Sequence, residues 1–212
     1  MKYKHIIWDW NGTLIDDRGL CVKGINNGLK KRNIPTITEE TFKEISTFPV
    51  EKIYQKVGFD FKEEPFEVAG DEFVTIYGKY FHEINLHANA QSVIHTIKEF
   101  GITQSILSAG KQDYLEDWVK HHSLSDYFIF IRGINNHYAR GKIELGISLV
   151  NELLYNKNEI IMVGDTIHDN EVAQEMGIDC LLLNHGHVSH KRLVDTGCKV
   201  LSNLEQVLDE VL

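Results

Sequence analysis

The sequence predicts an α/β fold, with a Rossmann-like parallel sheet core and an α-helical cap inserted after the first strand. Its short apolar runs are unbroken rather than alternating, as is typical of parallel strands that helices cover on both faces. Segments with helical spacing separate the later runs, and this alternation of strand and helix indicates a doubly wound sheet. Between residues 16 and 87 the alternation stops, and only helical patterns follow one another.

Five apolar runs are interpreted as buried strands, and a weaker sixth run follows them near the end of the chain. In order they are His5–Trp8, Gln104–Leu107, Tyr127–Ile131, Ile160–Val163, Cys180–Leu183 and the weaker Lys199–Leu201. The stretches from Tyr114 to His122 and from Leu145 to Leu153 repeat apolar residues at helical spacing. We therefore expect five parallel strands, with the first of them in a central position.

The inserted segment is predicted to form four helices. They are Gly24–Lys31, Glu39–Ile45, Val50–Val57 and Pro65–His82. Pro35 and Pro49 interrupt this run, because the residue before a proline is pushed out of helical geometry. We expect residues 1–15 and 88–212 to form the core domain and residues 16–87 to form the cap.

The composition narrows the class of protein. Of the 212 residues, 42% are hydrophobic and 25% are charged, an ordinary globular mixture. The net charge of −9 argues against a nucleic-acid partner, since phosphate contacts require a basic surface. The apolar runs are too short to span a bilayer, so no membrane partner is expected, and no basic leader precedes them.

The three cysteines, Cys21, Cys180 and Cys198, show no paired spacing. Reduced thiols are typical of a cytoplasmic protein, and we expect that location. In the simplest interpretation all three are small buried hydrophobic residues. We expect the protein to be a monomer or a homodimer.

A carboxylate follows the first predicted strand. Asp9 comes directly after Ile6, Ile7 and Trp8, and Gly12 allows the chain to turn tightly just beyond it. Open α/β sheets bind their ligands at the carboxyl ends of the strands. On this segment alone Asp9 could also cap a backbone amide in a simple strand-to-loop turn, so both interpretations stay open.

A second acidic segment follows the fourth predicted strand. Asp165 comes after Gly164, and Asp169 lies four residues later. If a helix starts after the turn, the two carboxylates converge on one side of the loop. Clustered carboxylates repel one another, so such a group usually holds a hard cation through oxygen ligands. A helix N-cap explains either aspartate alone, but it explains both of them less readily.

These segments and two others resemble the haloacid dehalogenase superfamily. The D-x-D-G-T-type motif of that family corresponds to Asp9 through Thr13, its serine or threonine to Ser108, its lysine to Lys142, and its acid pair to Asp165 and Asp169. The order and spacing fit across the whole chain. The helical insert, together with Asp16 seven residues after Asp9, is similar to the phosphoglycolate-phosphatase-like members that carry a helical cap.

The resemblance implies a magnesium-dependent phosphohydrolase that acts on a small phosphorylated metabolite. Asp9 would attack phosphorus and form an aspartyl-phosphate, which water then hydrolyses. The implied catalytic residues are Asp9, Asn11, Ser108 and Lys142, and the implied ligands of Mg²⁺ are Asp9, Asn11, Asp165 and Asp169. Asp169 would act by holding a metal-bound water or the lysine ammonium. The implied phosphate-binding residues are Asn11, Gly12, Thr13, Ser108, Ala109 and Lys142.

Asn11 departs from the family pattern. Most phosphatases of the family have a second aspartate there, which protonates the leaving group, whereas an amide cannot exchange a proton. General acid–base catalysis is typically worth about 10²–10⁴-fold in rate. The enzyme could prefer good leaving groups such as acyl phosphates or pyrophosphate, or His168 or His187 could replace the missing acid. It could also be a phosphotransferase, or a weak family member that only binds a phosphorylated ligand.

Two implied residues have competing interpretations. Arg140 is a second cation beside Lys142, although Lys142 is expected to face the site because the predicted helix begins after Gly141. Ser108 could be the N-cap of a helix over Lys111–His122, either instead of its implied role or in addition to it.

The sequence does not indicate a particular substrate. The turn from Ser46 to Val50 is a candidate for a cap loop that faces the site. Alternatively, Phe48 and Pro49 merely break and pack two cap helices.

Overall fold

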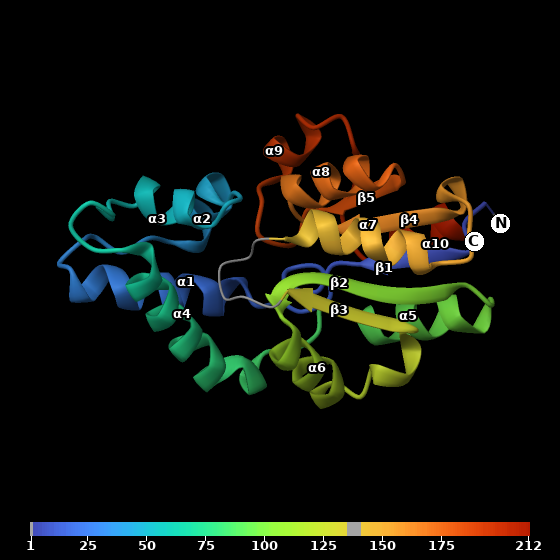
Figure 1. The fold of residues 1–212 in the computed structure, drawn as a ribbon, viewed down its shortest axis with the longest axis horizontal. Helices are drawn as coiled ribbons and strands as arrows, with labels where there is room; N and C mark the ends of the chain where they lie inside the picture. Colours follow the sequence, from blue (N-terminus) through green and yellow to red (C-terminus); the bar gives the residue numbers. More distant parts are fainter. Residues whose placement is uncertain (1, 135–140) are drawn as a thin grey trace.

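The computed structural model describes residues 2–134 and 141–212, and a six-stranded sheet lies at its centre (Figure 1). The strands are β1 (His5–Trp8), β2 (Thr103–Lys111), β3 (Phe130–Ile134), β4 (Ile160–Gly164), β5 (Asp179–Leu183) and β6 (Lys199–Leu201). Their order is β3-β2-β1-β4-β5-β6, and every neighbouring pair runs parallel. The predicted α/β class is therefore confirmed, with β1 near the middle of the sheet.

Two details of the sheet differ from the sequence prediction. The weak run over β6 pairs with β5, so the sheet has six strands rather than five. β3 begins at Phe130 instead of Tyr127, because Ser125–Tyr127 forms a short 3₁₀ helix, η2. As an edge strand β3 is covered less completely than the central strands β1 and β4, and its pairing with β2 continues through polar Arg132. Apolar character alone therefore misplaces β3.

Helices cover both faces of the sheet. On one face lie α7 (Lys142–Glu152) and α8 (Ile167–Met176), and on the other lie α5 (Ala90–Glu99), α6 (Gln112–His121) and α10 (Glu205–Val211). The side chains of β1 alternate between them. Ile6 and Trp8 pack with the second group and Ile7 packs with α7 and α8, all three fully buried. The remaining elements of this part are η3 (Lys157–Glu159) and α9 (His190–Val194).

The segment between residues 16 and 87 is helical and contains no strand of the sheet, all of its residues being described. Its elements are α1 (Arg18–Lys31), α2 (Glu39–Ile45), α3 (Glu51–Lys56), α4 (Phe66–Tyr80) and the 3₁₀ helix η1 (Phe81–Glu83). Figure 1 shows α1–α4 as a group beyond the carboxyl ends of the strands. α1 and α4 pack so closely at Gly24 that a Cβ there would lie 2.7 Å from the Phe73 ring.

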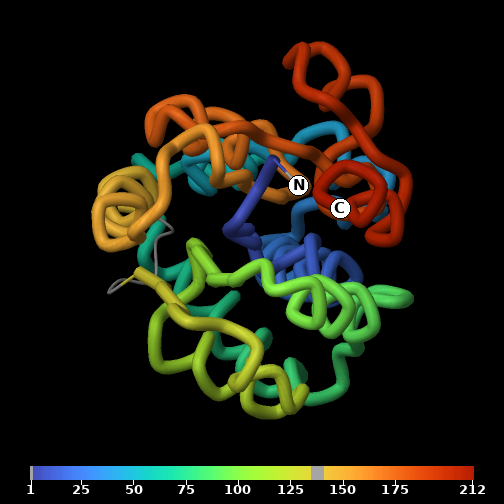
Figure 2. Tube along the Cα trace, turned by 90° about the vertical axis from the view of Figure 1, so that its right-hand side faces the viewer, coloured from blue at the N-terminus to red at the C-terminus, as the bar shows by residue number. Residues whose placement is uncertain are grey.

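The two segments that connect this helical group to the core lie side by side. The amide of Asp16 donates to the carbonyl of Asn85 at 3.0 Å, and the amide of His87 donates to the carbonyl of Leu14 at 2.9 Å. Figure 2 looks from the opposite end of the molecule, where both termini lie. The helical group is therefore joined to the core at one place, next to the end of β1.

Among residues 2–134 and 141–212, none of the helices is long and apolar enough to cross a membrane. The three cysteines are free thiols, of which Cys21 is buried and Cys180 and Cys198 are half-buried.

Candidate active site

Asp9 follows β1 directly and is buried. Its amide donates to the carbonyl of Val163 in β4 at 2.9 Å, which extends the ladder one residue beyond the strand. Gly12 lies in the left-handed region at φ +76°. A Cβ there would lie 2.5 Å from Asp165 Oδ2 and 2.8 Å from His187 Nδ1, so only glycine lets the loop approach. The turn thus brings the end of β1 against the end of β4.

Asp165 and Asp169 lie at the start of α8, and their carboxylates accept hydrogen bonds from different parts of the chain. Thr166 is the N-cap of α8, and its hydroxyl accepts from the Asp169 amide at 3.2 Å. Asp169 Oδ2 in turn accepts from the Thr166 amide at 2.9 Å and from its hydroxyl at 2.7 Å. Asp165 instead accepts from the Thr13 hydroxyl at 2.9 Å and from the His187 amide at 2.6 Å. Capping therefore explains one oxygen of Asp169, whereas Asp165 faces the loop that follows β1.

Lys142 joins the two acidic segments. It is the first residue of α7, its side chain is 3% exposed, and its Nζ lies 2.5 Å from Asp9 Oδ1 and 2.7 Å from Asp169 Oδ1. Gly141 precedes it with φ +99°, a conformation that favours glycine. Arg140, the competing cation, lies outside the described residues. Lys142 thus reaches the position that its place after Gly141 predicts.

Ser108 lies on β2, which ends at Lys111, four residues beyond the predicted end at Leu107. Its hydroxyl accepts from the Gly110 amide at 2.9 Å and donates to Asn11 Oδ1 at 3.3 Å. The N-cap residue of α6 is Lys111, so the interpretation of Ser108 as a helix cap is wrong. Ala109 lines the same cavity as Asp9 and Asn11.

The electrostatics of the acidic group follow from burial and from the single lysine. Burial raises the pKa of Asp9 to about 8 against the opposing effect of Lys142, and the neighbouring carboxylates add to the rise. Burial likewise raises the pKa of Asp165 to about 6. For Asp169 the attraction of Lys142 outweighs burial and lowers the pKa. Burial would lower the pKa of Lys142, but Asp169 and Asp9 hold it above its usual range. The site therefore carries an excess of negative charge.

The carboxylates of Asp9, Asp165 and Asp169 fit a divalent cation. Each offers an oxygen, and these atoms lie within 4.8 Å of one another. The Thr13 hydroxyl connects two of the acids, at 3.2 Å from Asp9 Oδ2 and 2.9 Å from Asp165 Oδ1. A donor set made only of oxygens suits a hard cation, and such a cation would offset the cost of burying several carboxylates together, which raises the pKa of Asp9 and Asp165. Asp169 is less available to a cation than Asp165, because both of its oxygens already accept hydrogen bonds, from Lys142 and from Thr166.

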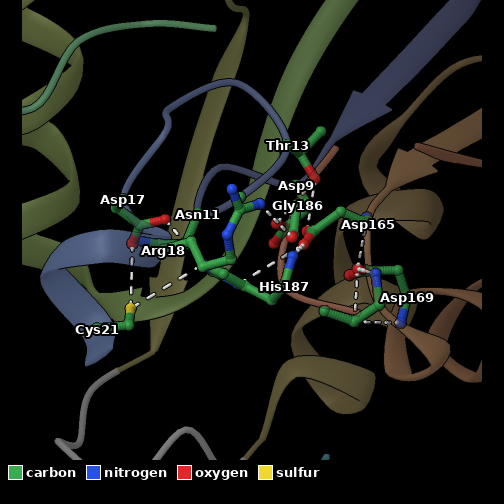
Figure 3. Close-up of polar contacts among 12 residues, drawn as sticks. Asp9, Asn11, Thr13, Asp17, Arg18, Cys21, Asp165, Asp169, Gly186 and His187 are labelled. Carbon is green, nitrogen blue, oxygen red and sulfur yellow. Dashed lines mark hydrogen bonds and ion pairs between the residues drawn. The ribbon is translucent and has the colours of Figure 1, made fainter. Parts of the chain in front are cut away.

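A second buried network surrounds Asn11, and sequence reasoning missed it (Figure 3). Asn11 Nδ2 donates to Asp17 Oδ2 and to the Tyr77 hydroxyl, at 2.9 Å each. The Tyr77 hydroxyl donates to the same Asp17 oxygen at 2.7 Å, and His187 Nε2 lies 2.9 Å from Asp17 Oδ1. Cys21 lies at the edge of the network, 3.6 Å from Asp17. Asp17 is thus the common partner of residues from three distant parts of the chain.

The charges of this network are paired. Burial alone would raise the pKa of Asp17, but the ion pair with His187 lowers it to about 2. Burial lowers the pKa of His187, but Asp17 and Asp165 together raise it well above its usual value. Burial raises the pKa of Tyr77, and Asp17 adds to the rise. Asn11 therefore faces an anionic carboxylate and a neutral phenol.

The two histidines considered as replacement acids lie in different places. His168 Nδ1 lies 3.0 Å from Glu171, and its ring stacks on Phe48 with the centroids 4.5 Å apart. It does not line the cavity that contains Asp9. His187 lines that cavity, but its ring nitrogens face Asp17 and, at 3.6 Å, Asp165. Neither histidine directs a ring nitrogen at Asp9.

The cavity around Asp9 extends to the helical group. The turn from Ser46 to Val50 lines it, and so do residues of α1, α3 and α4. Phe48 also stacks on the ring of His168 in α8, so this turn contacts the core as well as the cavity.

The comparisons with known proteins agree with this geometry. A model of the haloacid dehalogenase-like hydrolase family matches residues 6–183. Solved structures share the fold, among them the three that follow. A predicted phosphatase from Clostridium acetobutylicum has a TM-score of 0.86 at 18% identity, a haloacid dehalogenase-like family protein from Streptococcus pneumoniae 0.86 at 19%, and a predicted phosphoglycolate phosphatase from Haemophilus somnus 0.81 at 16%. In each case the alignment covers 100% of this chain and 99% of the other. A comparison with curated proteins found no match.

At these identities the solved structures establish the common fold and nothing about substrates. The family model covers most of the chain, including the segments of Asp9, Ser108, Lys142 and Asp165. The resemblance inferred from the motifs is therefore confirmed: the chain belongs to the haloacid dehalogenase-like hydrolases.

Proposed function

We propose that the protein is a magnesium-dependent phosphatase that acts on a small phosphorylated metabolite through an aspartyl-phosphate on Asp9. The pairing of Asp9 is the observation that carries the proposal. A carboxylate at a buried strand end has Lys142 Nζ at 2.5 Å and two further acids close by, at the floor of a cavity. A purely structural aspartate requires only a donor, whereas this arrangement supplies what phosphoryl transfer requires, namely positioning and charge neutralisation.

In the proposed reaction an oxygen of Asp9 attacks phosphorus in line with the bond to the leaving group. The phosphorus–oxygen bond to that group breaks, and the bonding electrons leave with it. Water then attacks the phosphorus of the aspartyl-phosphate, which releases inorganic phosphate and restores Asp9. Lys142 would hold the Asp9 carboxylate in place and offset its charge when the phosphate approaches, a task that suits an ammonium point charge.

Asp9, Asp165 and the backbone carbonyl of Asn11 would hold Mg²⁺, while Asp169 would orient Lys142. When bound, the cation would neutralise charge on the phosphate oxygens. We assign the phosphate contacts to Ser108, Ala109, Lys142, Thr13 and the backbone amide of Asn11. Gly12 was also predicted to contact phosphate. Its amide already donates to the Ile15 carbonyl at 3.0 Å, so we assign Gly12 the tight turn instead.

Residues 16–87 would act as a cap that admits the substrate and then excludes water. The segments near residues 14–17 and 87–91 would be its hinges, because they form the connection to the core. The predictions of no nucleic-acid partner, of a monomer or homodimer, and of a cytoplasmic location stand beside this proposal.

Magnesium-dependent release of phosphate from acetyl phosphate and p-nitrophenyl phosphate tests the proposal. Both leaving groups depart without a proton, so the absence of an acid at Asn11 does not prevent the reaction. We expect turnover that requires Mg²⁺ and stops when the metal is chelated. If neither compound is hydrolysed, the protein is instead a weak family member that binds a phosphorylated ligand.

The role of Asp165 in metal binding gives a direct prediction. Asp165→Asn should raise the dissociation constant of Mg²⁺ by at least about tenfold, because the amide retains the shape but not the charge of the ligand. Calorimetric titration with MgCl₂ measures it. The thermal midpoint of the metal-free protein should not fall, since the substitution removes one of three repelling carboxylates. Unchanged Mg²⁺ affinity would place the cation elsewhere.

The network around Asn11 predicts how an acid can be restored. Asn11→Asp alone would place a carboxylate about where Nδ2 now lies, 2.9 Å from Asp17 Oδ2, and the two anions would repel. Exchanging the residues, Asn11→Asp with Asp17→Asn, keeps one carboxylate in the network, and the ion pair of Asp17 with His187 becomes a hydrogen bond to an uncharged amide. The double variant should raise the rate on alkyl phosphates by at least about tenfold, and the single variant should raise it less.

Initial rates on ethyl phosphate and acetyl phosphate at saturating Mg²⁺ test this prediction. The acetyl phosphate rate should change less, because acetate needs no proton to leave. If the double variant leaves the ethyl phosphate rate unchanged, then protonation of the leaving group does not limit the enzyme.

A phosphotransferase is the second candidate, and Asn11 is the observation that favours it. Without an acid–base group to activate water, an aspartyl-phosphate would persist longer and could pass its phosphoryl group to another acceptor. Addition of alcohols or sugars during acetyl phosphate turnover distinguishes the two functions, because a transferase forms a new phosphate ester in place of inorganic phosphate.

A further inference from the structure

The cavity above Asp9 is polar at one end and apolar at the other. Its volume is about 220 Å³. Near the sheet it is bounded by Asp9, Lys142 and Asp169, whereas its far wall is formed by aromatic side chains of the helical group, among them Tyr54, Phe66 and Phe73. Of residues 16–87, all of them described, Asp17 at the start of α1 is the one charged side chain that lines the cavity. The part of the substrate beyond the phosphate therefore meets apolar walls.

Charged side chains that line the cavity are already engaged. Besides the acidic group and its lysine, the described lining contains Asp17, which pairs with His187, and Lys111. Lys111 Nζ lies 3.4 Å from Asp113 and 5.2 Å from the centre of the Tyr114 ring. A second carboxylate or phosphate on the substrate would lose its hydration and meet, among these residues, only Lys111, which it would share with the exposed Asp113; the lining therefore offers it no buried cation of its own.

We infer that the substrate is a small aryl phosphate, with an aromatic ring bonded to the phosphate oxygen. This inference rests on the proposed function and specifies its substrate class. Aromatic rings pack favourably against aromatic walls in edge-to-face arrangements. A cavity of about 150 Å³ lined by apolar side chains is sufficient to hold benzene, so about 220 Å³ has room for a ring together with the phosphate that it carries.

Asn11 supports the same substrate class independently. A phenolate is a much better leaving group than an alkoxide, because its negative charge is stabilised by the ring. An enzyme with an amide in place of the general acid is therefore better suited to aryl than to alkyl esters. The walls of the cavity and the residue beside the nucleophile thus select for one kind of compound.

Three phosphonates separate binding from leaving-group chemistry, because their carbon–phosphorus bond is not broken. Benzylphosphonate is the analogue of phenyl phosphate, ethylphosphonate that of methyl phosphate, and 3-phosphonopropionate that of phosphoglycolate. Calorimetric titration in saturating Mg²⁺ should show benzylphosphonate binding about ten to a hundred times more tightly than ethylphosphonate. The compound with the carboxylate should bind no more tightly than ethylphosphonate.

Two substitutions on α4 locate the ring. Val74 is half-buried and lines the cavity, whereas Val68 on the same helix is 41% exposed and does not line it. Val74→Lys should weaken benzylphosphonate by at least about tenfold and strengthen 3-phosphonopropionate, because it adds a cation to the apolar wall. Val68→Lys should leave all three affinities unchanged. Thermal unfolding of both variants verifies that they are folded.

Equal affinities of the wild-type protein for benzylphosphonate and ethylphosphonate would overturn the inference. So would tighter binding of 3-phosphonopropionate, no binding of any phosphonate, or equal effects of the two lysine variants. If Val74→Lys does not fold, the affinities of the wild-type protein for the three phosphonates still test the inference. Turnover of acetyl phosphate, which has no ring, is measured in the same preparation. If acetyl phosphate is not turned over, the proposed phosphatase function is wrong. If it is turned over but the phosphonates do not bind in the expected order, only the inferred aryl substrate is wrong.

Discussion

Replacing Asp9 with asparagine should lower the rate of phosphate release from acetyl phosphate by at least about a thousandfold. The amide occupies nearly the same volume but cannot attack phosphorus, and losses of this size or larger follow removal of an enzymatic nucleophile. Initial rates at saturating Mg²⁺ and substrate measure the effect. Asp126→Asn, the same substitution at an exposed position after α6, serves as the control and should retain full activity.

The Asp9→Asn variant should remain folded. Burial and the nearby acids raise the pKa of Asp9 to about 8, which shows that its ionised form is held at a cost. A neutral side chain removes that cost, although it also weakens the contact with Lys142. A thermal midpoint near that of the wild type would attribute the loss of activity to chemistry. If Asp9→Asn retains even a tenth of the wild-type rate, Asp9 is not the nucleophile.

Replacing Lys142 with methionine should lower the free energy of unfolding of the metal-free protein by about 3–5 kcal/mol. The Lys142 side chain is 3% exposed and its ammonium contacts Asp9 and Asp169, so its removal leaves buried carboxylates without a cation. Urea unfolding followed by circular dichroism measures the change. Saturating Mg²⁺ should recover part of the loss, because the metal neutralises the same acids. Phosphate release should also fall by at least about a hundredfold.

Lys111→Met is the matched control. Lys111 lines the same cavity, but its side chain is 30% exposed and its partner Asp113 is 77% exposed. Such a pair contributes less than about 1 kcal/mol. If Lys142→Met and Lys111→Met have equal effects on the free energy of unfolding, the proposed central role of Lys142 in holding the acidic group is wrong.

Local sequence patterns were sufficient to predict the fold and the main group of charged residues. Asp9 and Asp165 each follow a run of apolar residues, and the carboxyl ends of parallel strands meet at one edge of a sheet, so their proximity follows from topology. Lys142 could be placed because Gly141 marks the start of its helix. β3 was misplaced because an edge strand requires only one neighbour, and its polar residues pair as well as its apolar ones.

The network around Asn11 could not be predicted in this way. Its members come from the loop before α1, from α4 and from the segment after β5, and no periodicity relates Asp17 to Tyr77 and His187. From the sequence, a single Asn11→Asp substitution would restore the missing acid. The structure shows that Asp17 already supplies a carboxylate at 2.9 Å, so position 11 and position 17 must be changed together.

Trapping the phosphorylated enzyme tests the central claim most directly. The protein is mixed with acetyl phosphate and Mg²⁺, quenched in acid within the first turnovers, digested and analysed by mass spectrometry. We predict one phosphoryl group on the peptide that contains Asp9, its disappearance when turnover is completed before quenching, and its absence in Asp9→Asn. Rapid phosphate release with no phosphorylated peptide at any quench time, or with the phosphoryl group on another residue, would contradict the proposed mechanism.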